Sequence, residues 1–207
     1  DYLAEHGVES TLIRDETGTK ANLCTASCRG TRARRADTGT INQEASVSLT
    51  SDDDFDSDGQ GHKVDYSISG QKGDWDYLGA VSQEKRGVFY DGNDELVGIS
   101  YSGELQNSTS YDVMGRVGYW IDDNQNVELM LNHFELEGDG GYVAVSGNRD
   151  EGIPTRARKG NQIGDPSFNQ VTTANFAYSH ADWYGNKADV QLYSQRFRAQ
   201  FGTSPFF

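Results

Sequence analysis

Tyr111-Asp-Val-Met-Gly-Arg-Val-Gly-Tyr-Trp120 is followed by Ile121-Asp-Asp-Asn-Gln125 and then by Asn126-Val-Glu-Leu-Met-Leu-Asn-His-Phe134. On both sides of the central polar segment, apolar side chains largely alternate with polar or charged ones. This period of two is typical of a β-strand with one apolar and one polar face, whereas a helix would space its apolar residues three and four apart. The stretch therefore predicts two antiparallel strands joined by a tight turn.

The same alternation recurs along most of the chain. Seven segments of similar length share it, at residues 43–50, 62–70, 75–83, 109–120, 126–136, 170–180 and 187–198. We therefore predict an all-β fold, an antiparallel meander of about seven strands.

The connections between these segments are alternately long and short. Three are tight turns of four to six residues, at 71–74, 121–125 and 181–186. The other three have 11, 25 and 33 residues, at 51–61, 84–108 and 137–169. Bacterial outer-membrane barrels sort their connections in this way, with short periplasmic turns and longer extracellular loops. The alternation predicts that the meander is part of a transmembrane β-barrel in the bacterial outer membrane.

The composition agrees with this prediction and limits others. The chain has 207 residues, a net charge of -14, a hydrophobic content of 35% and a mean hydropathy of -0.73. No run approaches the roughly 20 apolar residues of a membrane-spanning helix, but a barrel strand needs only alternate residues to be apolar. The acidic charge argues against nucleic-acid binding, which requires a basic face. Asp1-Tyr-Leu-Ala-Glu5 carries no secretory signal, so we expect an exported protein to have lost its beginning here.

Aromatic residues gather at the short-turn end of the predicted strands. Six of them lie beside or inside a short turn: Trp75, Trp120, Trp183, Tyr77, Tyr119 and Tyr184. Indole and phenol rings favour the membrane–water interface because they combine an apolar body with a polar group. These residues are a candidate membrane-interface belt. The alternative is that aromatic residues simply favour strand ends and cap the core there.

Two segments are candidates for metal or redox chemistry. The acidic segment contains Asp54-x-Asp56-x-Asp58-Gly59, the front half of a calcium-loop pattern whose alternate aspartates supply several oxygens. No helical pattern flanks it, so a solvated acidic loop is the interpretation that we favour. Cys24 and Cys28 lie in an arginine-rich stretch without the further ligands of a zinc site. They are either a local disulfide or two unpaired thiols.

The chain carries no enzyme signature. It lacks a Gly-x-Ser-x-Gly elbow, a phosphate-binding loop and a paired His/Glu metal spacing. Gly138-Asp-Gly-Gly141 is rich in glycine but does not follow the strand–helix pattern of a phosphate site. We therefore expect a protein that is not an enzyme and needs no cofactor.

Several segments, taken in order, resemble one family. They are Lys63-Val-Asp-Tyr-Ser-Ile-Ser-Gly70, Gly73-Asp-Trp-Asp-Tyr77, Arg86-Gly-Val-Phe-Tyr-Asp-Gly92, Val127-Glu-Leu-Met-Leu-Asn-His-Phe134, Gly138-Asp-Gly-Gly-Tyr-Val143, Ile153-Pro-Thr155, Gly164-Asp-Pro166 and Gln191-Leu-Tyr-Ser-Gln-Arg-Phe197. Over roughly residues 38–201 the chain resembles the first barrel strands of TonB-dependent siderophore receptors. The resemblance implies a plug domain inside a barrel of about 22 strands, which imports ferric siderophores with energy from the TonB complex.

The chain departs from that family at its beginning and in its strand number. Residues 1–37 resemble neither a TonB-contacting segment nor the glycine-rich end of a plug. Seven strands are also fewer than the even set, eight or more, from which bacterial barrels close. We therefore expect residues 1–37 to be an unassigned leader, either a plug remnant or a misread segment, and residues 38–207 to be a partial receptor barrel.

The longest predicted loop is locally basic within an acidic chain. Five of its residues are candidates for ligand contact: Arg149, Arg156, Arg158, Lys159 and Tyr142. Ferric siderophores are often anionic, so a basic cluster would raise the local concentration of ligand. Lipopolysaccharide phosphates, or water alone, are the competing partners of these side chains. The resemblance thus implies three partners: a ferric siderophore, outer-membrane lipid or lipopolysaccharide, and the TonB complex reached through other parts of the receptor.

Two other functions stay open on the sequence alone. The first is a complete small outer-membrane barrel of about eight strands with a structural or adhesive role; it requires a closing strand that the sequence does not show. The second is a secreted calcium-binding β-sandwich that adheres to or cleaves polysaccharide. Such a sandwich would be soluble without detergent and would melt at a calcium-dependent temperature.

Overall fold

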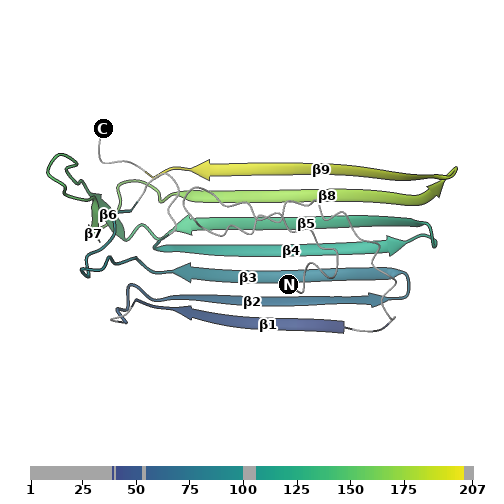
Figure 1. The fold of residues 1–207 in the computed structure, drawn as a ribbon, viewed down its shortest axis with the longest axis horizontal. Helices are drawn as coiled ribbons and strands as arrows, with labels where there is room; N and C mark the ends of the chain where they lie inside the picture. Colours follow the sequence, from purple (N-terminus) through teal and green to yellow (C-terminus); the bar gives the residue numbers. More distant parts are fainter. Residues whose placement is uncertain (1–38, 40, 53–54, 100–105, 203–207) are drawn as a thin grey trace. The chain divides into compact units, whose positions relative to one another are not determined.

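The computed structural model describes residues 39, 41–52, 55–99 and 106–202, which form one long antiparallel sheet and a small separate hairpin (Figure 1). The sheet strands are β1 (Ile41–Thr50), β2 (Gly61–Lys72), β3 (Trp75–Arg86), β4 (Ser108–Trp120), β5 (Gln125–Gly138), β8 (Phe168–Trp183) and β9 (Asn186–Gln200). The hairpin pairs β6 (Tyr142–Val145) with β7 (Arg156–Lys159). The predicted all-β meander of seven strands is confirmed, and the hairpin is an addition that the sequence did not predict.

The sheet is open in the described part of the chain. Its order is β1-β2-β3-β4-β5-β8-β9, so β1 and β9 are the two edge strands. An open, antiparallel meander of this kind fits part of a β-barrel, as predicted. The predicted leader, residues 1–37 with both cysteines, lies outside the described residues. None of the described residues forms a helix long and apolar enough to cross a membrane.

The short turns lie at one end of the strands and the long connections lie at the other end (Figure 1). The turns consist of residues 73–74, 121–124 and 184–185. Tyr184 and Gly185 both have positive φ, 52° and 80°, which is the geometry of the type I′ turn that matches the twist of paired strands. The long connections, at 51–60, 87–107 and 139–167, are therefore brought together at the opposite end.

The register gives the sheet one apolar face and one polar face. Directly opposed residues share a face, and one apolar row of such pairs crosses from β3 to β9. Its members are Tyr77, Val117, Leu129, Phe176 and Leu192. Four of the five are exposed in the chain as it stands, all except the tyrosine. A band of apolar side chains therefore faces outward without a partner in the described residues.

The polar face carries charged pairs in place of apolar ones. The guanidinium of Arg116 lies 2.8 Å from Asp76 Oδ1 and 3.1 Å from Glu128 Oε2, so one side chain of β4 links its two neighbouring strands. Further along the same face, Asn132 Nδ2 donates to Asp112 Oδ1 at 2.5 Å. The alternation that predicted the strands thus separates two environments, one apolar and one hydrogen-bonded.

A cluster of buried apolar residues lies outside the sheet. Val88, Ile99, Tyr142 and Ala157 are each at most 8% exposed and form a small core. Three partly buried residues pack against it: Tyr90, Leu96 and Ala144. All of these residues come from the β3–β4 connection and from the hairpin. The long connections therefore have an apolar core of their own, separate from the apolar face of the sheet.

Candidate functional site

The three long connections pack together at one end of the sheet's strands. We name the assembled part the loop unit, residues 55–60, 87–99 and 142–159. The Val88 N–H donates to the Asp58 carbonyl at 2.8 Å, which joins the first connection to the second. Val97 forms an antiparallel bridge with Arg156, which joins the second to the third. The loop unit is thus one ordered body built from three separate stretches of sequence.

Asp58 also joins the first connection to the third through its side chain. Its Oδ2 accepts a hydrogen bond from the Tyr142 hydroxyl at 2.8 Å and lies 2.5 Å from Lys159 Nζ. Tyr142 and Lys159 are opposite each other in the hairpin register, and residues opposite each other share a face. The hairpin therefore presents both donors to one carboxylate. We name these three residues the Asp58 cluster.

These contacts move the pKa of each group in the Asp58 cluster further from neutral pH. Hydrogen bonds from Lys159 and Tyr142 hold the pKa of Asp58 below its ordinary value of 3.8. Burial, and next the hydrogen bond to Asp58, raises the pKa of Tyr142. The hydrogen bond to Asp58 raises the pKa of Lys159. At neutral pH the cluster is therefore a carboxylate, a neutral phenol and an ammonium.

Arg156 joins the third connection to the second. Its Nη1 contacts the Asp91 carboxylate, and its Nη2 lies 2.5 Å from Glu95 Oε2. The Asp91 Oδ1 accepts backbone N–H groups from Asn93 at 2.9 Å and Glu95 at 3.2 Å, so a local turn orients this carboxylate. The hydrogen bond from Arg156 lowers the pKa of Asp91. We name Arg156, Asp91 and Glu95 the Arg156 cluster.

Gln106 supports the loop unit from inside. It is 3% exposed. Its Oε1 accepts the Phe89 N–H at 2.9 Å, and its Nε2 donates to the carbonyls of Val97 and Gly98 at 3.3 and 3.0 Å. A buried amide with both ends paired holds the backbone around it in one arrangement. Gln106 therefore links the start, middle and end of the β3–β4 connection to one another.

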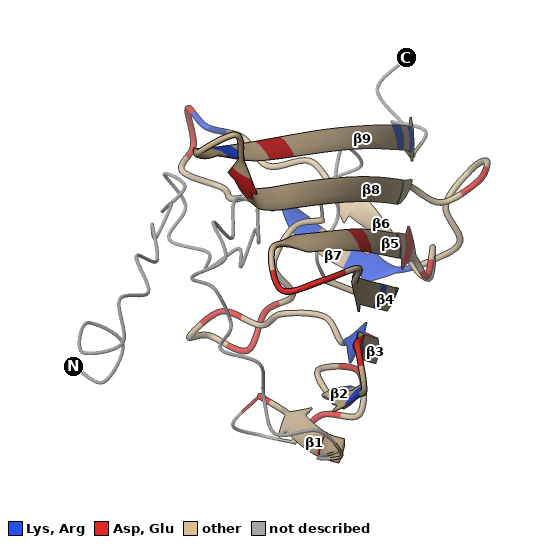
Figure 2. Cartoon of the chain, turned by 90° about the vertical axis from the view of Figure 1, so that its right-hand side faces the viewer, with Lys and Arg blue, Asp and Glu red and all other residues tan. Residues whose placement is uncertain are grey.

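The five predicted ligand residues fall into two groups. Tyr142, Arg156 and Lys159 are engaged with carboxylates from other connections. Arg149 and Arg158 have exposed side chains, and no ion pair with another described residue holds them. Figure 2 shows β7, which carries three of the four cations, as a basic strand. Contact with a ligand stays a prediction for all five residues.

A backbone hydrogen bond to an aspartate orders part of the predicted calcium loop. Asp54 lies outside the described residues, and Asp52 Oδ1 accepts the backbone N–H of Asp56 at 2.8 Å. Within the described ranges, no group of three or more acidic, histidine or cysteine side chains is arranged to hold a metal. The Lys159 ammonium also competes with any cation for Asp58. Calcium binding by these aspartates stays a prediction.

The six predicted belt residues lie at the short-turn end of the strands, but they do not share one face of the sheet. Three share the apolar face, Trp75, Tyr77 and Tyr119, and two of these rings, Trp75 and Tyr119, have centroids 4.6 Å apart. Trp120 follows on the polar face, while Trp183 and Tyr184 reach the β8–β9 turn, where they are 53% and 93% exposed. Their contact with a membrane interface stays a prediction.

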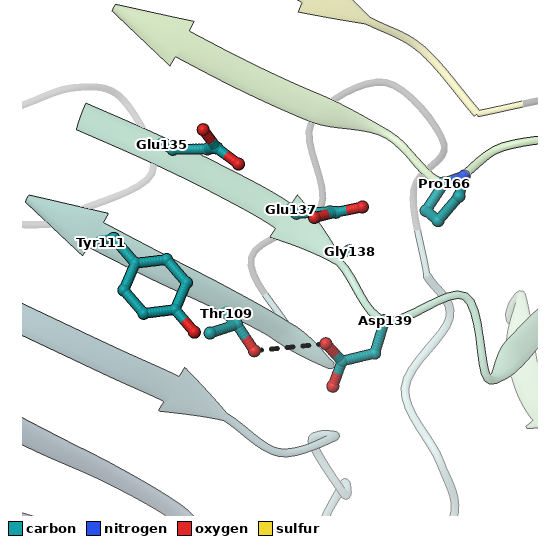
Figure 3. A pocket seen from close by; sticks show the side chains of 7 residues that line it. All are labelled: Thr109, Tyr111, Glu135, Glu137, Gly138, Asp139 and Pro166. Carbon is teal, nitrogen blue, oxygen red and sulfur yellow. Dashed lines mark hydrogen bonds between the residues drawn. The ribbon is translucent and has the colours of Figure 1, made fainter. Parts of the chain in front are cut away.

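A hollow of about 310 Å³ lies where β4 and β5 meet the long connections (Figure 3). It is lined by Thr109, Tyr111, Glu135, Glu137, Gly138, Asp139 and Pro166. Thr109 Oγ1 donates to Asp139 Oδ1 at 3.3 Å, and Gln170 Nε2 donates to Glu135 Oε2 at 3.0 Å. Its three carboxylates make the hollow acidic, so it disfavours an anionic ligand. The loop unit is the stronger candidate site.

Comparison with known proteins gives a partial similarity. No family model matches the chain, and no solved structure matches it significantly. The chain is 33% identical over 72 residues to the rhizobactin receptor of Rhizobium meliloti (strain 1021). The matched part is 33% of this chain and 9% of that receptor, so the chain spans less than a tenth of this relative's length. The relative is a receptor by name, which agrees in coarse terms with the resemblance described above.

Asp91, Glu95 and Gln106 are site residues that the sequence patterns do not single out. Asp91-Gly-Asn-Asp94 is a recognisable turn sequence, which explains the local hydrogen bonds of the first aspartate. No local signal reveals its pairing with Arg156, 65 residues further along the chain. The groups gathered in the loop unit are carboxylates, cations and a phenol. They are suited to ionic and hydrogen-bonded recognition.

Proposed function

We propose that this chain is an early barrel segment of a TonB-dependent receptor in the bacterial outer membrane, and that the receptor takes up a ferric siderophore. Residues 38–207 would supply the strands, and the lipid and the TonB complex would be partners of the whole receptor. The protein would be a transporter and not an enzyme. The similarity to the rhizobactin receptor supports this reading over part of the chain.

The apolar face of the sheet is the observation that carries the proposal. An apolar row crosses five successive strands of the sheet, most of its members are exposed, and the intervening residues form polar contacts on the other face. A soluble protein covers such a face, because a large exposed apolar patch marks a site of association. Lipid provides that cover in a membrane barrel, where strands alternate apolar outside and polar inside.

In this receptor the loop unit would face the medium and meet the ligand first. The short turns are periplasmic in outer-membrane barrels and the longer loops extracellular. Two further arginines, Arg149 and Arg158, are exposed on the hairpin that carries the paired cations Arg156 and Lys159. This basic surface would attract an anionic ferric complex to the outer end of the barrel.

The orientation is testable with single cysteines in the full-length receptor. Lys72, Asp123 and Asn186 mark the short-turn end, and Asp150 and Ile163 mark the long connections; all five side chains are exposed. Intact cells would be treated with a membrane-impermeant maleimide. Positions 150 and 163 should be labelled, and positions 72, 123 and 186 only after the outer membrane is permeabilised.

Iron uptake tests the rest of the proposal. Cells that lack the receptor gene should lose uptake of the iron-55-labelled siderophore fraction purified from their own iron-starved medium, and the gene should restore it. Equal labelling of all five cysteines in a protein recovered from the medium would instead favour the secreted β-sandwich. Correct labelling without any uptake would favour a structural or adhesive barrel.

A further inference from the structure

The two ion-pair clusters of the loop unit share one design. In each, a cation on β7 is paired with a carboxylate from a different connection: Lys159 with Asp58, and Arg156 with Asp91 and Glu95. Two of the four cations that the sequence predicts for an anionic ligand, Arg156 and Lys159, are therefore already paired with the protein's own anions. These same pairs join the three connections through polar side chains, beside the apolar core that the second connection shares with the hairpin.

Both clusters can be reached from solvent. The Lys159 side chain is 69% exposed and Asp58 is 30% exposed. In the other cluster Glu95 is 61% exposed, while Arg156 and Asp91 are 25% and 30% exposed. Ion pairs at such exposure are weak in net terms, because water competes for both partners. An external anion can therefore compete with the internal carboxylates for the same two cations.

We propose that a multivalent anion binds the loop unit by exchange at either cluster: it takes Lys159 from Asp58, or Arg156 from Asp91 and Glu95, and the loss of that pair loosens the connections that the pair joins. Ligand capture and loosening of the loop unit are then a single event. This inference rests on the proposed function for its biological ligand, an anionic ferric complex, but the exchange itself is a property of the described residues.

The surroundings of the clusters favour exchange over simple addition. Asp52, Asp56 and the Tyr90 ring lie near Asp58 and its lysine. An anion that approached while Asp58 stayed in place would meet several negative charges next to one ammonium. If Asp58 swings away, the incoming anion meets the ammonium with one fewer negative charge beside it. The apolar core of Val88 and its neighbours keeps the hairpin folded while the ionic contacts change partners.

Hydrogen–deuterium exchange on the full-length receptor in detergent at neutral pH measures the loosening directly. The probe is trisodium citrate, a trivalent anion, compared with sodium chloride at equal ionic strength. Peptides that cover 87–99 and 142–159 should exchange faster in citrate than in the matched chloride. Peptides from the strand centres should not respond.

Substitutions separate exchange from a merely structural role because the two predict different signs. Asp58→Asn and Asp91→Asn remove competing carboxylates, so the half-effect concentration of citrate should fall roughly two- to fivefold, the size expected for a weak exposed pair. Lys159→Met should raise it by a similar factor. The matched pair Lys187 and Asp189, 2.9 Å apart in β9, supplies controls whose substitution should change nothing.

The outcomes are distinct. No citrate-specific response, or a shift of the half-effect concentration in the same direction in all three variants, would overturn the exchange mechanism. Opposite shifts support it, and they do so whether or not the cells import a siderophore. A receptor that shows the exchange but no iron uptake would therefore contradict the proposed function and leave this inference standing.

Discussion

Gly87 lies where the first and second long connections approach most closely. A Cβ at this position would be 2.3 Å from the Asp58 carbonyl oxygen, 2.6 Å from the Gly59 carbonyl carbon and 2.8 Å from the Gln60 oxygen. All three are backbone atoms, which cannot rotate away as the end of a side chain can. The missing side chain is thus what lets the β1–β2 connection lie against the start of the β3–β4 connection.

Gly87→Ala should therefore destabilise the receptor by about 1–3 kcal/mol, the range for an extra methyl group forced into a packed site. Gly92→Ala, in the same connection, is the matched control, because a Cβ there meets nothing within 4 Å. It should change the free energy of unfolding by less than about 0.5 kcal/mol. Urea unfolding in detergent micelles measures both. Equal effects would mean that the close approach does not determine the assembly of the loop unit.

The titrating groups of the loop unit predict the pH range in which it stays assembled. The lowered pKa of Asp58 means that its contribution is complete above pH 3.8 and is lost as the pH falls through its lower folded value. The pKa of Tyr142 is raised above 10.0, so its contribution is complete below that pH and is lost above it. Assembly should therefore be constant across the neutral range and weaken at both ends.

Spin labels at Ser57→Cys and Glu151→Cys, both exposed, would report the distance between the first and third connections. The distance distribution should be narrow at pH 7 and broaden below pH 3.8. Asp91 also titrates below its ordinary value because of Arg156, so the receptor with both Asp58→Asn and Asp91→Asn should show no acid transition. A transition near pH 6 would point to a histidine instead and contradict this account.

At the scale of elements, the sequence predicts the sheet well because each strand carries its own signal. Every predicted sheet strand exists, and all seven extend one to three residues beyond the alternating segment at one or both ends; β3, for example, continues from residue 83 to Arg86. The extension occurs because backbone hydrogen bonds continue wherever a neighbouring strand is present, even where the side chains no longer alternate. The short turns are shorter than predicted for the same reason.

The hairpin of β6 and β7 could not be predicted in this way. Each strand has four residues, and one of them is Arg-Ala-Arg-Lys, which has a single apolar residue. Its stability comes from partners remote in sequence, such as the contact between Asp58 and Tyr142, 84 residues apart. Local patterns contain no information about such contacts. The basic candidate residues on the hairpin were found through their charge, whereas Asp91 and Glu95 were not found and Asp58 was found only as a calcium candidate.

The two faces of the sheet predict responses of different size to an introduced charge. Leu129 lies in the middle of the apolar row, and Leu129→Arg should destabilise the receptor by about 2–4 kcal/mol in a lipid bilayer. Met114→Arg on the neighbouring strand β4 is the control, because Met114 lines a hollow on the polar face with Asp65 and Asp112. It should cost less than about 1 kcal/mol. Unfolding in lipid vesicles is the measurement. Tolerance of Leu129→Arg would place that face in water and contradict the membrane proposal.

At the scale of the whole molecule, the sheet has two kinds of uncovered surface. Among the described residues, β1 and β9 each have a strand neighbour on one side, so a row of backbone N–H and C=O groups has no strand partner there on the other. Large apolar side chains are also exposed along the apolar face, including Val47 at 69% and Leu192 at 64%. Exposed strand edges and large apolar patches both promote association between chains.

The 207-residue chain in detergent-free buffer should therefore aggregate, because its edges and its apolar face will be satisfied by other copies. Sedimentation velocity measures this, with the same chain refolded in detergent as the comparison. Detergent should reduce the aggregate, since it covers the apolar face, but should not remove association through the edges. A monodisperse, cooperatively unfolding monomer without detergent would favour the soluble β-sandwich.

The strand order determines the sequence of steps in which such a sheet can fold. Within the described residues, each sheet strand pairs only with the sheet strands that precede and follow it along the chain. The hairpin-bearing connection, residues 139–167, separates β5 from β8, which pair with each other. Contacts between near neighbours in sequence form quickly, because little chain must be closed into a loop. The sheet can therefore grow in the order of synthesis, with each finished hairpin acting as the template for the next strand.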